Sequence, residues 1–364
     1  MMYEGQYVPN AADIIYGSFI RYDRLFEMTK FAFYGKTDSN EVNIFIDVYS
    51  ILKGLYTNSK HLIIDSYVIT SCIVNLAIHL RAYFDTRHRT HSKIYIIYGG
   101  ARPSDIPNLD VVYNFKNIQL EESDSYLKNL IKDNMEAIKI LTPYLYDIFT
   151  IIDYKNEFNV IAGSIISDNA NQNNITPNII YSKDPMSYQL VAFRPRTFLY
   201  RPKKKANEDA SWVVTKSTLY NAYRYGELGL KKQFETSLDV KMFSIYQSIC
   251  GVKSRSIPSM KNGSQTIKIL EKAVRNNIFA NGYNASNIMR ENTAFSQFCA
   301  LEGIDHRVIA YFSAIDLEYR SILYRSTPAY MGIQSGLVNL YNPQEVRNIN
   351  DKYFQKYPLD LNRI

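Results

Sequence analysis

The stretch that decides the fold is Val42-Asn43-Ile44-Phe45-Ile46-Asp47, an apolar run of strand length that ends in a carboxylate. Similar runs follow over residues 93–98, 150–153 and 178–182. Longer segments with helical spacing separate them, over about 62–84, 126–144 and 156–167. Strand-length runs that alternate with helices are typical of βαβ units and a parallel sheet. The sequence therefore predicts a doubly wound α/β domain at the start of the chain.

The second half of the chain has a different pattern. A length of 364 residues exceeds the roughly 250–300 at which a single hydrophobic core stops growing. Composition shifts after Trp212, which is the only tryptophan, and the patterns from Leu219 onward are helical. Asn342-Pro343-Gln344-Glu345 has the residues of a helix start. We predict an α/β domain over 1–212 and a mainly helical region over 213–364.

Composition narrows the class of protein. Forty-two Lys and Arg against thirty-five Asp and Glu give a net charge of +7, which permits a polyanionic partner. The longest apolar stretch, 61–80, contains Asp65, Asn75 and His79, so it predicts a buried helix rather than a bilayer span. Three cysteines without metal-ligand spacing fit a reducing compartment. We expect no secretory signal, no membrane partner and a cytoplasmic location.

Residues that follow the strands are the first candidates for a site, because ligands of open parallel sheets bind beyond the carboxyl ends of the strands. Asp47, Gly99, the segment 156–159 and Asp184 lie there. Their order resembles the 5′-nuclease and flap-endonuclease superfamily, whose fold is PIN-like. In that family the first strand ends in a metal-binding Asp, matched here by Asp47, and the fourth leads into Ser-x-Asp-x-Asp and a Gln-Leu pair. Ser182-Lys183-Asp184-Pro185-Met186-Ser187-Tyr188-Gln189-Leu190 has this spacing, with Met186 for the second Asp.

A downstream motif extends the resemblance over roughly residues 40–275. Gly251-Val252-Lys253-Ser254-Arg255-Ser256-Ile257-Pro258 is similar to the family's Gly-Asp-x-x-Asp-Asn-Ile-Pro, with Val252 and Arg255 where acids belong. The hairpin after it, 259–266, keeps Gly263, is one residue short and has Gln265-Thr266 in place of Lys-Thr. The resemblance implies a PIN-like sheet followed by a helix-hairpin-helix-like element, and suggests a phage or viral origin.

The catalytic acids that the family needs are incomplete. Two divalent ions about 3.5–4 Å apart require clustered carboxylates, and the resemblance supplies Asp47, Glu157 and Asp184 for that role. Gly99 stands where the second strand should end in Asp. Asn159 follows Glu157 at the second acidic position, unless the motif aligns on Val160-Ile161-Ala162, which has no acid. We expect a vestigial site without a resident metal, with Mg²⁺ or Mn²⁺ bound only if activity survives, and a salt bridge from Arg255 to Asp47 or Asp184.

Two basic segments are candidates for binding nucleic acid. The first follows the fourth strand, with Phe198 and Tyr200 interleaved, and a solvated basic loop is its alternative explanation. Its basic residues are Arg194, Arg196, Arg201, Lys203, Lys204 and Lys205. The second surrounds the hairpin and comprises Lys253, Arg255, Lys261, Gly263, Thr266 and Lys268. The family's helical arch should fall between the second strand and the helix that begins at about Tyr126, where Arg102 and Lys116 are the only basic residues.

Three functional hypotheses follow. The first is a catalytically inactive 5′-nuclease-like protein that serves as a nucleic-acid-binding or protein-interaction subunit of a phage or viral replication or transcription assembly. The second is a divergent metal-dependent nuclease that uses the reduced site. The third is a structural protein whose tyrosine-rich surface contacts other proteins, because tyrosine is enriched at interface hot spots.

Overall fold

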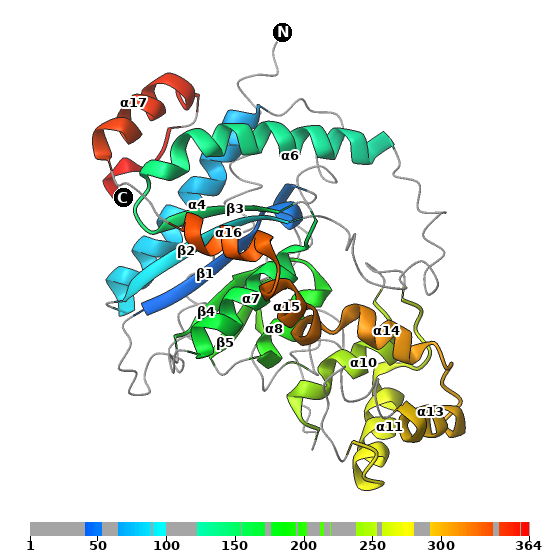
Figure 1. Ribbon diagram of the computed structural model, residues 1–364. Helices are drawn as coiled ribbons and strands as arrows, with labels where there is room; N and C mark the ends of the chain where they lie inside the picture. Colours follow the sequence, from blue (N-terminus) through cyan, green and yellow to red (C-terminus); the bar gives the residue numbers. More distant parts are fainter. Residues whose placement is uncertain are drawn as a thin grey trace.

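A six-stranded sheet organises the protein (Figure 1). The computed structural model describes residues 41–52, 65–88, 90–99, 122–153, 155–171, 176–193, 196–201, 212–214, 219, 238–252, 257–279, 292–337, 342–356 and 358–363. The strands lie in the order β3-β2-β1-β4-β5-β6. They are β1 Glu41–Asp47, β2 His91–Gly99, β3 Ile148–Asp153, β4 Asn178–Tyr181, β5 Thr197–Arg201 and β6 Trp212–Val214. β1 to β5 are parallel and β6 is antiparallel to β5.

Helices cover both faces of the sheet, so the predicted doubly wound α/β architecture is confirmed. Those between the strands are α4 Ser66–His88, α6 Glu122–Leu141, α7 Phe158–Asn171 and α8 Tyr188–Phe193, with short 3-10 turns η2 Thr142–Tyr144 and η3 Pro185–Ser187. α4 and α6 lie on one face, and α7 and α8 on the other (Figure 1).

The central strand β1 shows why the sheet is buried on both sides. Alternate residues of a strand point to opposite faces. Phe45 packs with α7 and α8, whereas Ile44 and Ile46 pack with α4. α4 is apolar and long enough to cross a membrane over Ser66–Thr86, but 78% of that window is buried inside the fold. It is a core helix, as the polar residues within it predict.

The predicted helical region is also confirmed. Its elements are η6 Val240–Met242, α10 Phe243–Cys250, α11 Gly263–Arg275, α13 Asn292–Leu301, α14 Val308–Ile315, α15 Leu317–Arg325, α16 Pro328–Gly336, α17 Pro343–Tyr353 and η8 Leu361–Arg363. The last helix begins where the sequence predicts, because the Asn342 side chain accepts hydrogen bonds from the amides of Gln344 and Glu345. α10 and α11 flank an antiparallel backbone bridge between Val252 and Ile257, as in a helix-hairpin-helix.

The helical region packs against the sheet domain. One hydrophobic cluster joins α7 and α8 to α10, α14 and α15. On the other face, Asn75 of α4 donates to the carbonyl oxygen of Pro358 at 3.0 Å and accepts from the amide of Asp360 at 2.7 Å. The division at residue 212 stays a prediction, because residues from both sides of it share a core.

Two strands were missed, β5 and the short antiparallel strand β6. The segment after the fourth strand, interpreted from the sequence as a basic loop or edge, contains the parallel strand β5. Phe198 and Tyr200, which alternate with basic residues there, are 9% and 3% exposed. Both rings face the α4 side of the sheet, so neither is available to stack on a nucleic-acid base.

Candidate functional site

Asp47 and Asp184 meet at the carboxyl edge of the sheet. Asp47 ends β1, and Asp184 lies three residues beyond the neighbouring parallel strand β4. Ser182 bridges them: its Oγ donates to Asp47 Oδ2 at 2.6 Å and accepts from the backbone amide of Asp184 at 3.0 Å. The two aspartates that the sequence selected therefore form a pair around one serine hydroxyl.

Asp47 is a buried carboxylate with local donors. It is 3% exposed. The hydroxyl of Ser50 donates to Oδ2 at 2.5 Å, and the amide of Ser50 donates to Oδ1 at 3.1 Å. Burial raises the pKa of Asp47 to about 6, although the hydrogen bonds from Ser182 and Ser50 oppose the rise. Asp184 adds a smaller upward shift to the pKa of Asp47 through its negative charge.

Asp184 is held by the turn that follows β4 and by α7. It caps η3 by accepting a hydrogen bond from the amide of Met186 at 3.0 Å. Asn159 donates to Asp184 Oδ2 at 3.0 Å and accepts from the hydroxyl of Ser187 at 2.7 Å. Of the two alignments that the sequence left open, this contact favours the one that places Glu157 and Asn159 at the site.

Glu157 is paired with a cation that the sequence analysis missed. Arg320 of α15 forms an ion pair with Glu157, and their side chains are 8% and 3% exposed. The signal was available: the buried face of α15 consists of Leu317, Arg320, Ser321 and Tyr324, at helical spacing. An arginine on a buried helical stripe indicates a buried ionic partner. Arg255, which was expected to pair with Asp47 or Asp184, lies outside the described residues.

Asp153 is a fourth acid at the same edge, which the sequence analysis did not select. It ends β3 and faces Gly99 of β2 in the sheet register. Tyr324 of α15 donates its hydroxyl to Asp153 Oδ2 at 2.6 Å, and Asn156 donates its amide to the same oxygen at 3.0 Å. Asp153 and Glu157 are thus both contacted by α15.

Gly99 leaves no space for the acid that the resemblance places at the end of the second strand. A Cβ atom on Gly99 would lie 2.4 Å from the backbone nitrogen of Phe158 and 2.9 Å from the carbonyl carbon of Glu157. Both neighbours are main-chain atoms at the start of α7, which cannot rotate away. The start of α7 therefore occupies the position that a β2 carboxylate would need.

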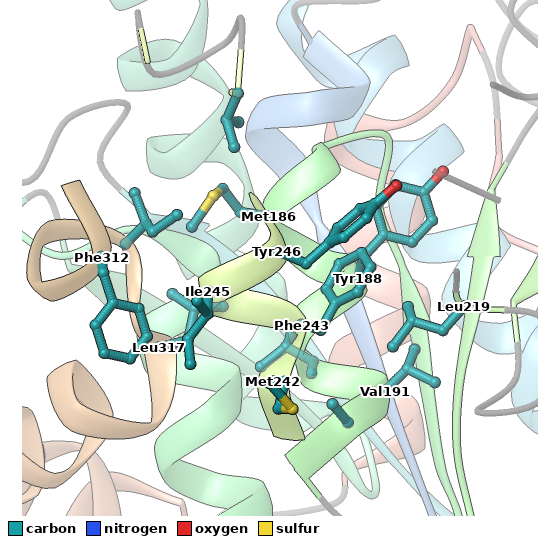
Figure 2. Packing of buried hydrophobic residues seen from close by; sticks show 14 of the residues in the cluster. Met186, Tyr188, Val191, Leu219, Met242, Phe243, Ile245, Tyr246, Phe312 and Leu317 are labelled. Atoms are coloured by element: carbon teal, nitrogen blue, oxygen red, sulfur yellow. The ribbon is translucent and has the colours of Figure 1, made fainter. Parts of the chain in front are cut away.

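Two other expected acidic positions have become core residues. Met186 is fully buried, and Figure 2 shows it among Tyr188, Ile245 and Tyr246. Val252 is 1% exposed. Its backbone forms the bridge to Ile257, with N to O distances of 3.1 and 3.2 Å. Neither side chain carries an oxygen that a hard cation would bind.

The residues present do not fit a two-metal centre. Among the described residues, no group of three or more His, Cys, Asp and Glu side chains could hold a metal ion. Asp47 and Asp184 already accept hydrogen bonds on both of their oxygens. Glu157 is neutralised by Arg320. Two divalent ions need more negative charge than this edge offers.

The predicted nucleic-acid-binding residues around the hairpin differ in their exposure. Gly263 is the first residue of α11, where Asn262 and Gln265 form a capping box. The Thr266 side chain is fully buried, and its hydroxyl donates to the carbonyl oxygen of Asn262 at 3.0 Å. The prediction that this side chain contacts phosphate is therefore wrong. Lys261 is half-buried before this helix and Lys268 is exposed on it. Lys253 and Arg255 lie outside the described residues.

The two described residues of the first basic segment lie at opposite ends of β5. Arg196 lies in a left-handed turn (φ 60°) at the amino end of β5, where its carbonyl oxygen accepts from the amide of Asn178. Arg201 ends the strand. At about 3.3 Å per residue, the backbone of Arg196 lies roughly 16 Å from the backbone of Arg201, so the two residues are at opposite ends of β5. Arg194, Lys203, Lys204 and Lys205 lie outside the described residues.

Solved structures of bacteriophage T5 proteins are similar to this chain. The sequence matches no protein-family model and no curated protein. The chain is similar to a crystal structure of a bacteriophage T5 protein with metal ions, at 12% identity and a TM-score of 0.49, over 85% of this chain and 98% of that one. The flap endonuclease of bacteriophage T5, in a product complex with DNA and metal ions, matches at 12% identity and a TM-score of 0.47, over 86% of this chain and 100% of that one. The T5 5′-exonuclease with zinc gives 14% identity and a TM-score of 0.44, over 86% and 98%. These similarities concern the fold and carry no chemistry with them.

Proposed function

We propose that this chain is a catalytically inactive 5′-nuclease-like protein. The observation that carries the proposal is the replacement of acids around the Asp47 and Asp184 pair. Gly99 is closed off by the backbone of α7, and Met186 is part of the core. Phosphodiester hydrolysis with divalent metals depends on the negative charge of clustered carboxylates. Both carboxylate oxygens of Asp47 and of Asp184 accept hydrogen bonds from protein groups.

The proposed role is that of a nucleic-acid-binding subunit of a larger assembly, in the cytoplasm of a host cell if the chain is viral. The net charge of +7 and the sequence pI of about 9.0 support a polyanionic partner. The helix-hairpin-helix arrangement of α10 and α11, with Lys261 and Lys268 beside the start of α11, supports duplex phosphates as the contact.

A protein-interaction role is the second candidate, and one observation favours it. Ile322, Leu323 and Met331 on α15 and α16 are 52%, 45% and 57% exposed. Exposed apolar patches mark sites of protein contact, among other interaction sites. This role predicts that Ile322→Ser/Met331→Ser weakens assembly with a protein partner and leaves the affinity for duplex DNA unchanged.

Cleavage assays test the proposal directly. The full chain is incubated with flapped, nicked and single-stranded DNA in Mg²⁺ or Mn²⁺, with Asp47→Ala/Asp184→Ala as the control. We expect equal, background-level cleavage by both proteins. Metal-dependent cleavage by the wild type that disappears in the control would instead support the divergent nuclease of the second hypothesis.

A further inference from the structure

Helix α15 contacts both acids that lie beyond β3. Arg320 is ion-paired with Glu157, and the Tyr324 hydroxyl donates to Asp153 at 2.6 Å. Arg320 and Tyr324 are four residues apart, so they project from one face of the helix. One helix therefore supplies a positive charge and a hydrogen-bond donor to neighbouring carboxylates.

The position of α15 is fixed by contacts that do not involve these acids. The Ser321 hydroxyl donates to the carbonyl oxygen of Val160 at 3.4 Å, and Ser164 of α7 donates to the carbonyl oxygen of Ser321 at 3.2 Å. The amide of Leu317, at the start of α15, donates to the side chain of Gln189 at 3.0 Å. These contacts of α15 hold Arg320 next to Glu157.

The buried carboxylate of Glu157 needs a positive partner, because an unpaired charge in a low-dielectric interior is strongly destabilising. A guanidinium and a divalent cation would repel one another at the same carboxylate. We propose that Arg320 takes the place of a divalent cation at Glu157, so that this edge of the sheet is complete without metal. The inference rests on the proposed function, since it treats the acids beyond β3 as remnants of a metal site.

The test is the thermal unfolding midpoint of the full chain in millimolar Mn²⁺ and in EDTA. The wild type should give the same midpoint in both. Arg320→Met should lower the midpoint by roughly 6–10 °C in EDTA, because it leaves Glu157 unpaired. Mn²⁺ should restore part of this loss. Arg325→Met is the matched control, because Arg325 lies on the same helix and pairs with Asp168 at 3.2 Å in a more exposed setting. It should shift the midpoint by less than roughly 2 °C.

A double variant separates charge replacement from general damage. Glu157→Met/Arg320→Met removes both charges and should recover most of the midpoint without any response to Mn²⁺. If Arg320→Met does not fold, recovery in the double variant still supports the inference. An equal loss in both variants, a single variant that Mn²⁺ does not stabilise, or a wild type stabilised by Mn²⁺ through Glu157 would overturn it. Cleavage of DNA by the wild type would contradict the proposed function without changing these midpoints.

Discussion

Two pairs of acids lie along the same edge of the sheet and are stabilised in different ways. Asp47 and Asp184, beyond β1 and β4, accept hydrogen bonds from serine hydroxyls, an asparagine amide and backbone amides. Asp153 and Glu157, beyond β3, are contacted by a tyrosine and an arginine from α15. The donors to the first pair come from the sheet edge and from the adjoining helix α7, whereas the second pair is also contacted by a helix more than 150 residues later in the sequence.

Under the proposed function, the two pairs represent two routes by which a carboxylate site loses its chemistry. Around the first pair, the neighbouring acidic position became apolar, since Met186 now fills the core. Around the second pair, the acids remain and Arg320 supplies the positive charge.

Restoring the lost acid beside the first pair should have the largest effect. Met186→Asp places an unpaired carboxylate in the core, and we expect the free energy of unfolding to fall by about 4 kcal/mol or more. Urea unfolding followed by circular dichroism measures it. Met186→Leu is the control and should cost less than about 1.5 kcal/mol. A Met186→Asp protein that is stable and becomes more so with Mg²⁺ would show that this half can still assemble a metal site.

A side chain added at Gly99, next to the second pair of acids, should lower the free energy of unfolding almost as much. Gly99→Ala introduces a Cβ atom 2.4 Å from the backbone nitrogen of Phe158. Because that neighbour is main chain, we expect a loss of more than about 3 kcal/mol, measured by the same unfolding experiment. Gly332→Ala is the matched control, since nothing lies within 4 Å of its added methyl group. Equal stability of the two variants would mean that α7 can retreat from β2 and admit a side chain.

Much of the first half of this edge could be predicted from the sequence, because its signals are local. An apolar run that ends in Asp47, and a second run that leads to Ser182 and Asp184, place these residues at one edge once the strands are parallel. The strand order β3-β2-β1-β4 comes from the structure, because an alternation of strands and helices predicts a parallel sheet without fixing the order of its strands. The pairing of Asp47 with Asp184 through Ser182 is then a consequence of register.

The second half could not be predicted in the same way, because its partners come from a distant helix. Nothing near Glu157 in the sequence indicates Arg320, and the only salt bridge that the sequence analysis expected joined Arg255 to Asp47 or Asp184. β5 was missed for a related reason. Its apolar residues are too few to stand out against the flanking arginines and lysines, and burial of Phe198 and Tyr200 depends on pairing with β4. Tertiary context decided both cases.

The pH dependence of stability distinguishes a carboxylate without a counter-cation from one that has a cation. The pKa of Asp47 rises from 3.8 to about 6 in the folded protein. The folded state therefore binds this proton more tightly than the unfolded state, and stability falls as the pH rises from about 4 to about 6. Asp47→Asn should raise the free energy of unfolding by about 1–3 kcal/mol at pH 8 and change it little at pH 4.

Denaturant unfolding at the two pH values provides the measurement. Asp316→Asn is a useful parallel variant, because burial raises the pKa of Asp316 to about 6 as well. It should remove the part of the fall in stability with rising pH that Asp316 causes. If Asp47→Asn instead destabilises the protein at pH 8, a cation compensates the ionised Asp47. The contrast between the two pairs of acids would then be lost.

The smallest expected effect concerns the surface far from both pairs, at the start of α11. If Lys261 and Lys268 contact duplex phosphates, Lys261→Ala/Lys268→Ala should lower the salt slope of binding by about 0.9 for each contact removed, with little sequence preference. Lys139→Ala/Lys356→Ala is the matched control. These lysines pair with Glu136 and Asp65 and belong to the part of the chain that covers the other face of the sheet.

An equal slope in the two double variants would place the nucleic-acid contact elsewhere. An absence of duplex binding by the wild type at low salt would leave the apolar side chains of α15 and α16 as the better candidate for the partner surface. The helix that holds the second pair of acids on its inner face would then present the binding surface on its outer face.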